Sequence, residues 1–281
     1  MIDTIGQYKI LERVGASALG DLYRGRDLRV GRTVSIIIVA SEIAADLAER
    51  ARFLADATAA SRLSHPNIAA IYEVGVENDR LFLAAEFISG QTLAQLVGTH
   101  PLNPRRAIDY ATQIADALAA AHGAGLAHGA VTGQTIVVTA KDSAKILDYG
   151  LSAWTGDRSS DDEAGDLAAL GRLLFQMLTA RVPQRGWPAP APSSVNRQVP
   201  LELDRLVAKL LVGSRQVQTS AAVVAAELRA IGATLDVPEA PGDAPSMADR
   251  EAERFSAKWL VFVLAIAGLA LIWAAIATFR G

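Results

Sequence analysis

The chain has 281 residues, a length that suits one large domain or two small ones. Its 27 basic and 30 acidic residues leave a net charge of −3, which excludes nucleic-acid binding driven by a strongly basic surface. Because it contains no cysteine, the chain can form neither disulfides nor thiolate metal sites, and it has no cysteine nucleophile.

The N-terminal part of the chain predicts a small lobe rich in β-strand. Four segments follow a strand pattern: residues 8–14, 22–24, 33–39 and 81–87. Residues 33–39 are apolar and largely β-branched, as in a strand that is buried on both faces. Between the strands, residues 42–63 are rich in alanine and charge and predict a helix that ends before Pro66.

The following part of the chain predicts helices. Four segments carry the pattern: residues 104–124, 166–180, 201–212 and 220–231. A small β-rich lobe followed by a larger helical lobe is an α+β arrangement.

The C-terminal end predicts a single transmembrane helix over residues 258–280. From Trp259 to Phe279 there is no charged side chain, and this run matches the roughly 20 apolar residues that a helix needs to cross a bilayer. Lys258 and Arg280 bound the run, and nothing after it could bury the apolar surface.

The flanking charges predict the orientation of this span. Arg250, Arg254 and Lys258 precede the span and only Arg280 follows it, so the N-terminal domain is expected in the cytoplasm, tethered to the cytoplasmic membrane. The first residues have neither a basic nor an apolar stretch, so no signal peptide is expected. Residues 233–257, rich in proline and alanine, predict a linker and a juxtamembrane segment.

Six segments carry motifs whose order and spacing resemble those of one family. They are the glycine-rich loop (14–23), the segment after helix C (64–68), the hinge (86–93), the catalytic loop (121–136), the segment with Asp-Tyr-Gly in place of Asp-Phe-Gly (145–151) and the helix F pattern (166–171). Any one of these matches is weak, but six in order are specific. The chain resembles the bacterial Hanks-type serine/threonine protein kinases, and the resemblance implies a two-lobed protein-kinase-like fold over residues 6–232.

The resemblance also implies where the catalytic groups should lie, and five of those positions are degenerate. The strand lysine falls at Ile37, and its helix C glutamate partner falls at Asp56. The catalytic base falls at Ala130, while the loop lysine and the metal-binding asparagine fall at Thr132 and Thr135. Phosphoryl transfer relies on charge stabilisation, and a base contributes about 10²- to 10⁴-fold in rate. The sequence therefore predicts a pseudokinase that has no catalytic residues and is not an enzyme.

Other family positions keep residues that suit a nucleotide. The candidate nucleotide-binding residues are Gly15, Ser17, Gly20 and Leu22. Asp148 is expected to cap the Asp-Tyr-Gly turn, and its alternative role is that of a ligand for Mg or Mn beside ATP, the one cofactor that these positions suggest. The resemblance implies that His128 packs against Tyr149 rather than acting as an acid or base.

Two functional classes follow from the sequence. The first is a membrane-anchored pseudokinase that serves as a cytoplasmic binding, scaffolding or regulatory module in signalling. Its partner would be a protein, such as an active kinase or its substrate, and not a nucleic acid. The alternative is a weakly active or atypical ATP-dependent serine/threonine protein kinase. A displaced cation such as Arg24 would favour the alternative, whereas apolar side chains that fill the cleft would favour the first.

Overall fold

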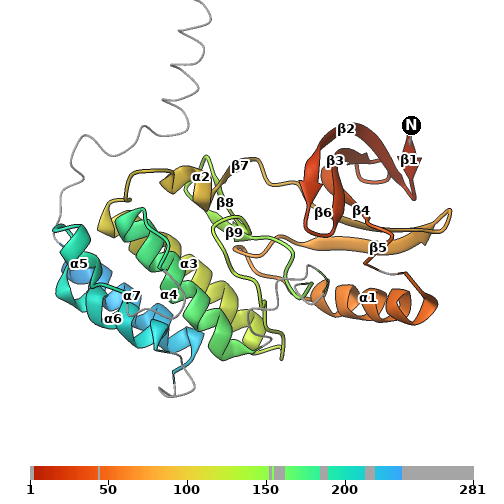
Figure 1. Cartoon of the computed structure of the whole chain (residues 1–281). Coiled ribbons are helices and arrows are strands. Elements are labelled where there is room, and N and C mark those ends of the chain that lie inside the picture. The colour runs from red at the N-terminus through yellow and green to blue at the C-terminus, as the bar shows by residue number, and fades with distance from the viewer. Residues whose placement is uncertain are drawn as a thin grey trace, which may run out of the picture. The chain divides into compact units, whose positions relative to one another are not determined.

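The structure, a computed structural model, describes residues 3–43, 45–151, 154, 162–183, 189–212 and 219–235. These residues form a β-rich N-terminal lobe and a helical C-terminal lobe, as the sequence predicts (Figure 1). Both lobes belong to the compact unit Met1–Pro238.

The N-terminal lobe is built on one antiparallel six-stranded sheet with the strand order β1-β2-β3-β4-β6-β5. Its strands are β1 (Thr4–Ile5), β2 (Tyr8–Ser17), β3 (Gly20–Asp27), β4 (Thr33–Val39), β5 (Ile71–Glu77) and β6 (Arg80–Glu86). Helix α1 (Leu47–Ala60) packs against one face of this sheet (Figure 1).

Strand β4 is buried on both faces, as its residues predict. Val34 and Ile36 lie in the hydrophobic cluster on one face of the sheet. Ile37 and Val39 lie on the other face, in a cluster with Phe53 of α1. A β-branched run fits this position because the branched side chains pack well on a pleated surface.

The hairpin of β2 and β3 is longer than the two strands predicted from the sequence. Pairing continues to Ser17 and Gly20, which face each other across the tip. The Ser17 hydroxyl donates to the Gly20 carbonyl oxygen at 3.3 Å and accepts from the Leu19 amide at 3.2 Å. Pairing with the neighbouring strand supplies the hydrogen bonds that extend each strand through its glycines, and a local sequence pattern does not contain that information.

Helix α1 begins at Leu47, five residues later than predicted, because Asp46 caps it. The Asp46 carboxylate accepts from the Glu49 amide at 2.8 Å, and the Glu49 carboxylate accepts from the Ala45 amide at 3.0 Å. This reciprocal arrangement satisfies two donors at the helix start. Strand β5, which the sequence analysis missed, is an edge strand with a weak apolar pattern.

The C-terminal lobe combines helices with a small antiparallel sheet of strand order β7-β8-β9. Its strands are β7 (Gly90–Thr92), β8 (Ile136–Thr139) and β9 (Ala144–Ile146). Its helices are α2 (Leu93–Val97), α3 (Pro104–His122), α4 (Glu163–Thr179), α5 (Pro192–Val195), α6 (Leu201–Leu211) and α7 (Ala221–Thr234).

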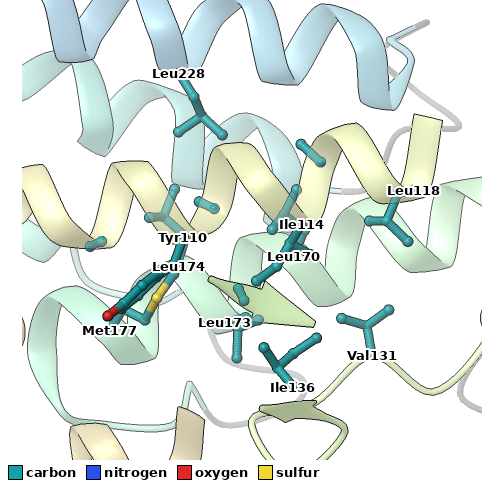
Figure 2. Close-up of a cluster of buried hydrophobic side chains, with 14 of the residues drawn as sticks. Tyr110, Ile114, Leu118, Val131, Ile136, Leu170, Leu173, Leu174, Met177 and Leu228 are labelled. Carbon is teal, nitrogen blue, oxygen red and sulfur yellow. The ribbon is translucent and has the colours of Figure 1, made fainter. Parts of the chain in front are cut away.

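Helix α3 is the centre of the C-terminal core, where it packs against α4 and α7. Figure 2 shows side chains of these helices meeting there, and each of the following is at most 3% exposed: Tyr110, Ile114, Leu118, Leu170, Leu173, Leu174 and Leu228. Full burial of such a side chain stabilises the fold by about 1.5–3 kcal/mol. This core provides a rigid base for the loop between α3 and β8.

Helix α4 begins three residues earlier than predicted. The Asp162 carboxylate accepts from the Gly165 amide at 2.8 Å and caps the helix, so the first helical residue is Glu163. Helix α7 extends to Thr234, slightly past the predicted segment.

In the part of the chain that the structure describes, no helix is long and apolar enough to cross a membrane. The predicted span over residues 258–280 lies outside the described residues, as does the predicted linker from residue 236 onward.

Candidate active site

A buried carboxylate on α4 anchors the loop that corresponds to the catalytic loop. Asp166 is fully buried and accepts from the amides of His128 and Gly129 at 2.7 and 2.8 Å. His122 Nε2 lies 2.9 Å from the same carboxylate. These partners offset the unfavourable burial of charge. Asp166 of α4 therefore fixes the start of the loop through backbone amides, without a contact from the side chain at position 130.

His128 has a packing role, as the resemblance implies. Its ring is 1% exposed and lies edge-on to Tyr149, with ring centroids 4.9 Å apart. Nδ1 accepts from the Ala130 amide at 3.2 Å, and Nε2 lies 3.0 Å from the Leu147 carbonyl oxygen, which assigns the proton to Nε2. Burial lowers the pKa of His128, so the imidazole stays neutral and is held by both nitrogens.

The loop positions Ala130, Thr132 and Thr135 lie in one loop, and their polar groups form hydrogen bonds within that loop. The Thr135 hydroxyl accepts from the Thr132 amide at 2.9 Å and lies 3.2 Å from the Ala130 carbonyl oxygen. The Thr132 hydroxyl accepts from the Gln134 amide at 3.3 Å. Ala130 is 9% exposed and has no side-chain proton acceptor. This arrangement keeps the shape of the loop without a carboxylate at its centre.

Asp148 lies beside this loop, because the Leu147 amide donates to the Thr135 carbonyl oxygen at 2.8 Å. The residue adopts a left-handed backbone with φ 53°, and the turn is closed by the Leu151 amide, which donates to the Asp148 carbonyl oxygen at 3.2 Å. Among the described residues, the Asp148 carboxylate has no hydrogen-bond partner, so it does not cap the turn. Burial raises the pKa of Asp148 to about 6. A carboxylate in this state gains from a nearby cation.

The four predicted nucleotide-binding residues all lie on the hairpin of β2 and β3. Gly20 has a φ of 149°, and a Cβ there would lie 2.1 Å from the Ile38 carbonyl oxygen, so only glycine fits. A Cβ at Gly15 would meet nothing within 4 Å. Ser17 uses its hydroxyl within the hairpin tip, and Leu22 is partly buried against the cluster that contains Ile37.

The strand position that the family fills with lysine lies in an apolar cluster. Ile37 is 4% exposed and packs with side chains of α1. Asp56 of α1 is not left without a partner, since its carboxylate accepts from the Trp154 indole nitrogen at 3.0 Å. Arg24, the candidate displaced cation, has its Nε 2.9 Å from the Glu12 carboxylate within the hairpin.

Three residues near this site did not emerge from the sequence analysis. Leu19 and Leu151 are fully buried in the cluster around Ile37, and Trp154 packs against it. The sequence did contain a signal for them, because an apolar residue at the tip of a glycine-rich loop and apolar residues just after Asp-Tyr-Gly indicate buried positions. The cluster itself depends on contacts between distant segments.

Comparison with known proteins supports the fold and the family. The chain matches the protein kinase domain over residues 8–190. It is 31% identical over 240 residues to the serine/threonine-protein kinase PknD of Mycobacterium tuberculosis, covering 73% of this chain and 36% of PknD. It is 29% identical over 204 residues to the serine/threonine-protein kinase PrkC of Bacillus subtilis, covering 64% of this chain and 32% of PrkC.

Among solved structures, the fold resembles the kinase domain of Mycobacterium tuberculosis PknI with a TM-score of 0.69. The match covers 82% of this chain and 98% of that domain at 22% identity. The molecule thus has a two-lobed protein-kinase fold, and the chain belongs to the protein kinase domain family, among relatives of the bacterial Hanks type. The chain spans about a third of the length of the curated relatives that it matches.

The prediction that this chain is not an enzyme is wrong. The relatives that match most of the chain are named serine/threonine-protein kinases, and the matched region includes every position described above. The prediction equated the loss of particular side chains with the loss of activity. Phosphoryl transfer, however, depends on positioning and on charge stabilisation distributed over many groups, so the substitution of some of them does not by itself abolish activity.

Proposed function

We propose that this chain is an atypical, ATP-dependent serine/threonine protein kinase of low activity. The observation that carries the proposal is the Asp148 carboxylate, which lies beside the catalytic loop of a kinase fold without a hydrogen-bond partner among the described residues. The rise of its pKa to about 6 means that a cation near it would be stabilised.

The residues of the site fit a magnesium or manganese nucleotide. A magnesium ion takes most of its ligands from phosphates and water and needs only one or two carboxylates, so Asp148 alone is compatible with it. Among the described residues there is no group of three acidic or histidine side chains that would hold a metal ion without nucleotide. When bound, the metal would offset the negative charge of the phosphates. The β2–β3 hairpin, with Gly15, Ser17 and Gly20, would cover them.

The substitutions in the loop predict a slow reaction. In the transfer, the bond from the terminal phosphorus to its bridging oxygen breaks, and a bond from that phosphorus to a serine or threonine hydroxyl forms. Ala130 cannot accept the hydroxyl proton, which would pass to water or to a phosphate oxygen. A positioned base contributes about 10²- to 10⁴-fold, so the rate should be lower than that of a kinase with a base by this order.

The test is a phosphotransfer assay on the full chain with radiolabelled ATP and Mg²⁺ or Mn²⁺. We expect slow, metal-dependent labelling of serine or threonine that Asp148→Asn lowers at least tenfold. Asp109→Asn, on the exposed side of α3, is the matched control and should leave the rate unchanged. Equal labelling by the wild type and Asp148→Asn, or neither binding of ATP nor labelling by the wild type, would contradict the proposal.

We also propose that the chain is anchored in a membrane by residues 258–280, with the kinase domain over residues 6–232 in the cytoplasm. The support is the uncharged run from Trp259 to Phe279 and the excess of basic residues before it. A tether of this kind would confine the domain to partners at the membrane surface.

A second candidate function is regulation of a protein partner, either an active kinase or its substrate. It is favoured by the apolar side chains around Ile37, because none of them can supply the charge stabilisation on which phosphoryl transfer relies. Its test is whether the full chain alters the rate of a candidate kinase, and whether Asp148→Asn does so equally. If the rate of the candidate kinase is the same with and without this chain, the regulatory role is contradicted.

A further inference from the structure

Apolar side chains from two distant segments meet between the glycine-rich hairpin and α1. Leu19 lies at the tip of the β2–β3 hairpin, and Leu151 follows the Asp-Tyr-Gly turn. Both are 0% exposed, and both belong to the cluster that contains Ile37. Trp154 packs against the same cluster. Leu19, Leu151 and Trp154 are together called the apolar plug below.

Leu19 is held inward by its backbone. Its carbonyl oxygen accepts from the Ala40 amide at 2.9 Å, just after β4, and its amide donates to the Ser17 hydroxyl at 3.2 Å. The first of these bonds ties the hairpin tip to the end of β4, and the second fixes the backbone within the tip. The side chain of Leu19 consequently points into the cluster and away from solvent, although the tip of a hairpin is usually exposed.

Trp154 is fastened to α1 by three kinds of interaction. Its indole nitrogen donates to the Asp56 carboxylate at 3.0 Å. Its ring meets Phe53 edge-on, with centroids 5.4 Å apart, and the Arg52 guanidinium lies 5.6 Å from the ring centroid. Asp56 occupies the position from which the family carboxylate pairs with the strand lysine, so in this chain the partner of α1 comes from the segment after Asp-Tyr-Gly.

We propose that the apolar plug holds the glycine-rich hairpin in a closed position and that nucleotide binding requires the plug to open. This inference rests on the proposed nucleotide site. A charged phosphate is not stable against an apolar cluster, because it would lose hydration without gaining a partner. The hairpin can therefore cover phosphates only after Leu19 leaves the cluster. The measured affinity is then the intrinsic affinity reduced by the fraction of molecules that are open.

The first experiment compares nucleotide affinity between two variants that each remove three carbon atoms. Leu19→Ala weakens the plug, whereas Ile36→Ala truncates an equally buried side chain on the opposite face of the sheet. For the full chain in detergent micelles with Mg²⁺, we expect ATP and ADP to bind at least fivefold more tightly to Leu19→Ala than to the wild type. Ile36→Ala should stay within twofold of the wild type. Weaker or unchanged binding by Leu19→Ala would overturn the proposal.

The second experiment needs no nucleotide. Trp154→Phe keeps an aromatic ring but removes the donor to Asp56, and Tyr8→Phe is its control, because it removes the hydroxyl that donates to Glu73 at 2.8 Å elsewhere in the lobe. We expect Trp154→Phe to speed amide hydrogen exchange severalfold in the peptides that contain Leu19 and Ala40. Tyr8→Phe should not change those peptides, and neither variant should change α3.

The two experiments separate failure of the plug from failure of the proposed function. If exchange at Leu19 and Ala40 is the same in Trp154→Phe as in the wild type, the plug does not act as a unit and the inference is wrong. If no variant binds nucleotide but hydrogen exchange rises as expected, the proposed nucleotide site is wrong, and so is the proposed link between plug opening and nucleotide binding. The closed apolar cluster would still be supported. Tighter nucleotide binding by Leu19→Ala together with faster hydrogen exchange in Trp154→Phe supports both the nucleotide site and the apolar plug.

Discussion

At the scale of single residues, the two central side chains of the Asp-Tyr-Gly turn are in unfavourable surroundings. Burial raises the pKa of Asp148 to about 6, above its ordinary value of 3.8. The hydroxyl of Tyr149 is buried without a hydrogen-bond partner among the described residues. Such unfavourable groups are typical of functional sites, where a ligand rather than the fold supplies the missing partner.

The raised pKa of Asp148 predicts a dependence of stability on pH. The folded state holds the proton up to about pH 6 and the unfolded state only to about pH 4, so the charged carboxylate destabilises the folded chain increasingly as the pH rises through this window. Asp148→Asn should therefore stabilise the chain by about 1–3 kcal/mol at pH 7 without metal, and by almost nothing below pH 4. Urea denaturation across this pH range measures the difference.

Asp142→Asn is the control, because we expect it to change the stability of the chain in the opposite direction. Burial alone would raise its pKa, but hydrogen bonds from Tyr110 and Arg106 outweigh burial and lower it. Asp142→Asn should thus destabilise the chain at pH 7. This loss of stability should become smaller as the pH falls below the ordinary aspartate pKa of 3.8. If both asparagine variants destabilise the chain at pH 7, the assignment of an unpaired carboxylate to Asp148 is wrong.

The unpartnered hydroxyl of Tyr149 predicts that phenylalanine is the better residue for stability. Tyr149→Phe removes the buried hydroxyl and keeps the ring that meets His128, so we expect a gain of about 1 kcal/mol in the free energy of unfolding. Tyr110→Phe is the matched control and should destabilise, since its hydroxyl donates to Asp142 at 2.8 Å. A loss of stability in Tyr149→Phe, seen by thermal denaturation, would mean that the hydroxyl has a partner in solution.

At the scale of secondary-structure elements, the C-terminal lobe holds the candidate active site through α4, and the N-terminal lobe closes it through α1. Asp166 of α4 fixes the start of the catalytic loop, and Asp56 of α1 binds the segment after Asp148. Asp166 thus joins α4 to His128 and Gly129, and Asp56 joins α1 to Trp154. The geometry of the site therefore depends on the two helices more than on the residues at the centre of the loop.

This dependence predicts a large effect at Asp166. Asp166→Ala leaves the amides of His128 and Gly129 without their acceptor in a fully buried position, and we expect it to destabilise the chain by about 3–5 kcal/mol. Asp166→Asn keeps one acceptor oxygen and should cost less. Ala130→Gly, in the same loop, should have a much smaller effect. Urea denaturation of the three variants gives the order, and a cost for Asp166→Ala no larger than that for Ala130→Gly would contradict the anchoring role.

At the scale of the whole molecule, every helix and strand of the described residues lies within the compact unit Met1–Pro238. The hydrophobic clusters that hold the two lobes also lie within it. The contacts that stabilise the kinase domain thus lie within this unit, whereas the proposed membrane anchoring depends on residues 258–280. The two properties should be separable by truncation.

We therefore expect a chain that ends at Pro238 to melt within a few degrees of the full chain, because it keeps all of the described core. The full chain should remain with membranes after washing in salt and require detergent for release, whereas the truncated chain should be recovered without detergent. Fractionation and thermal denaturation of both chains measure these outcomes. Release of the full chain by salt alone would count against the proposed anchor.

Elements whose signal is local were predictable from the sequence. Strand β4 has an apolar, largely β-branched run, which is typical of a strand with two buried faces. Helix α3 has a cap at Asn103, a proline at its first position and a glycine after its end, so its start was predicted to the residue and its end within two. Strand β5 and the tip of the β2–β3 hairpin were missed, because their regular structure comes from pairing with neighbouring strands.

What the sequence determined by itself was the order of the lobes, the family resemblance and the side chains at the degenerate positions Ile37, Ala130 and Thr135. What only the tertiary structure decided was the environment of the remaining groups. The partner of Asp56 lies 98 residues away at Trp154, and the burial of Leu19 depends on a helix and a turn that are distant in the chain. Motifs are patterns along the chain, whereas a hydrogen-bond partner or a buried cluster arises from contacts between segments that folding brings together.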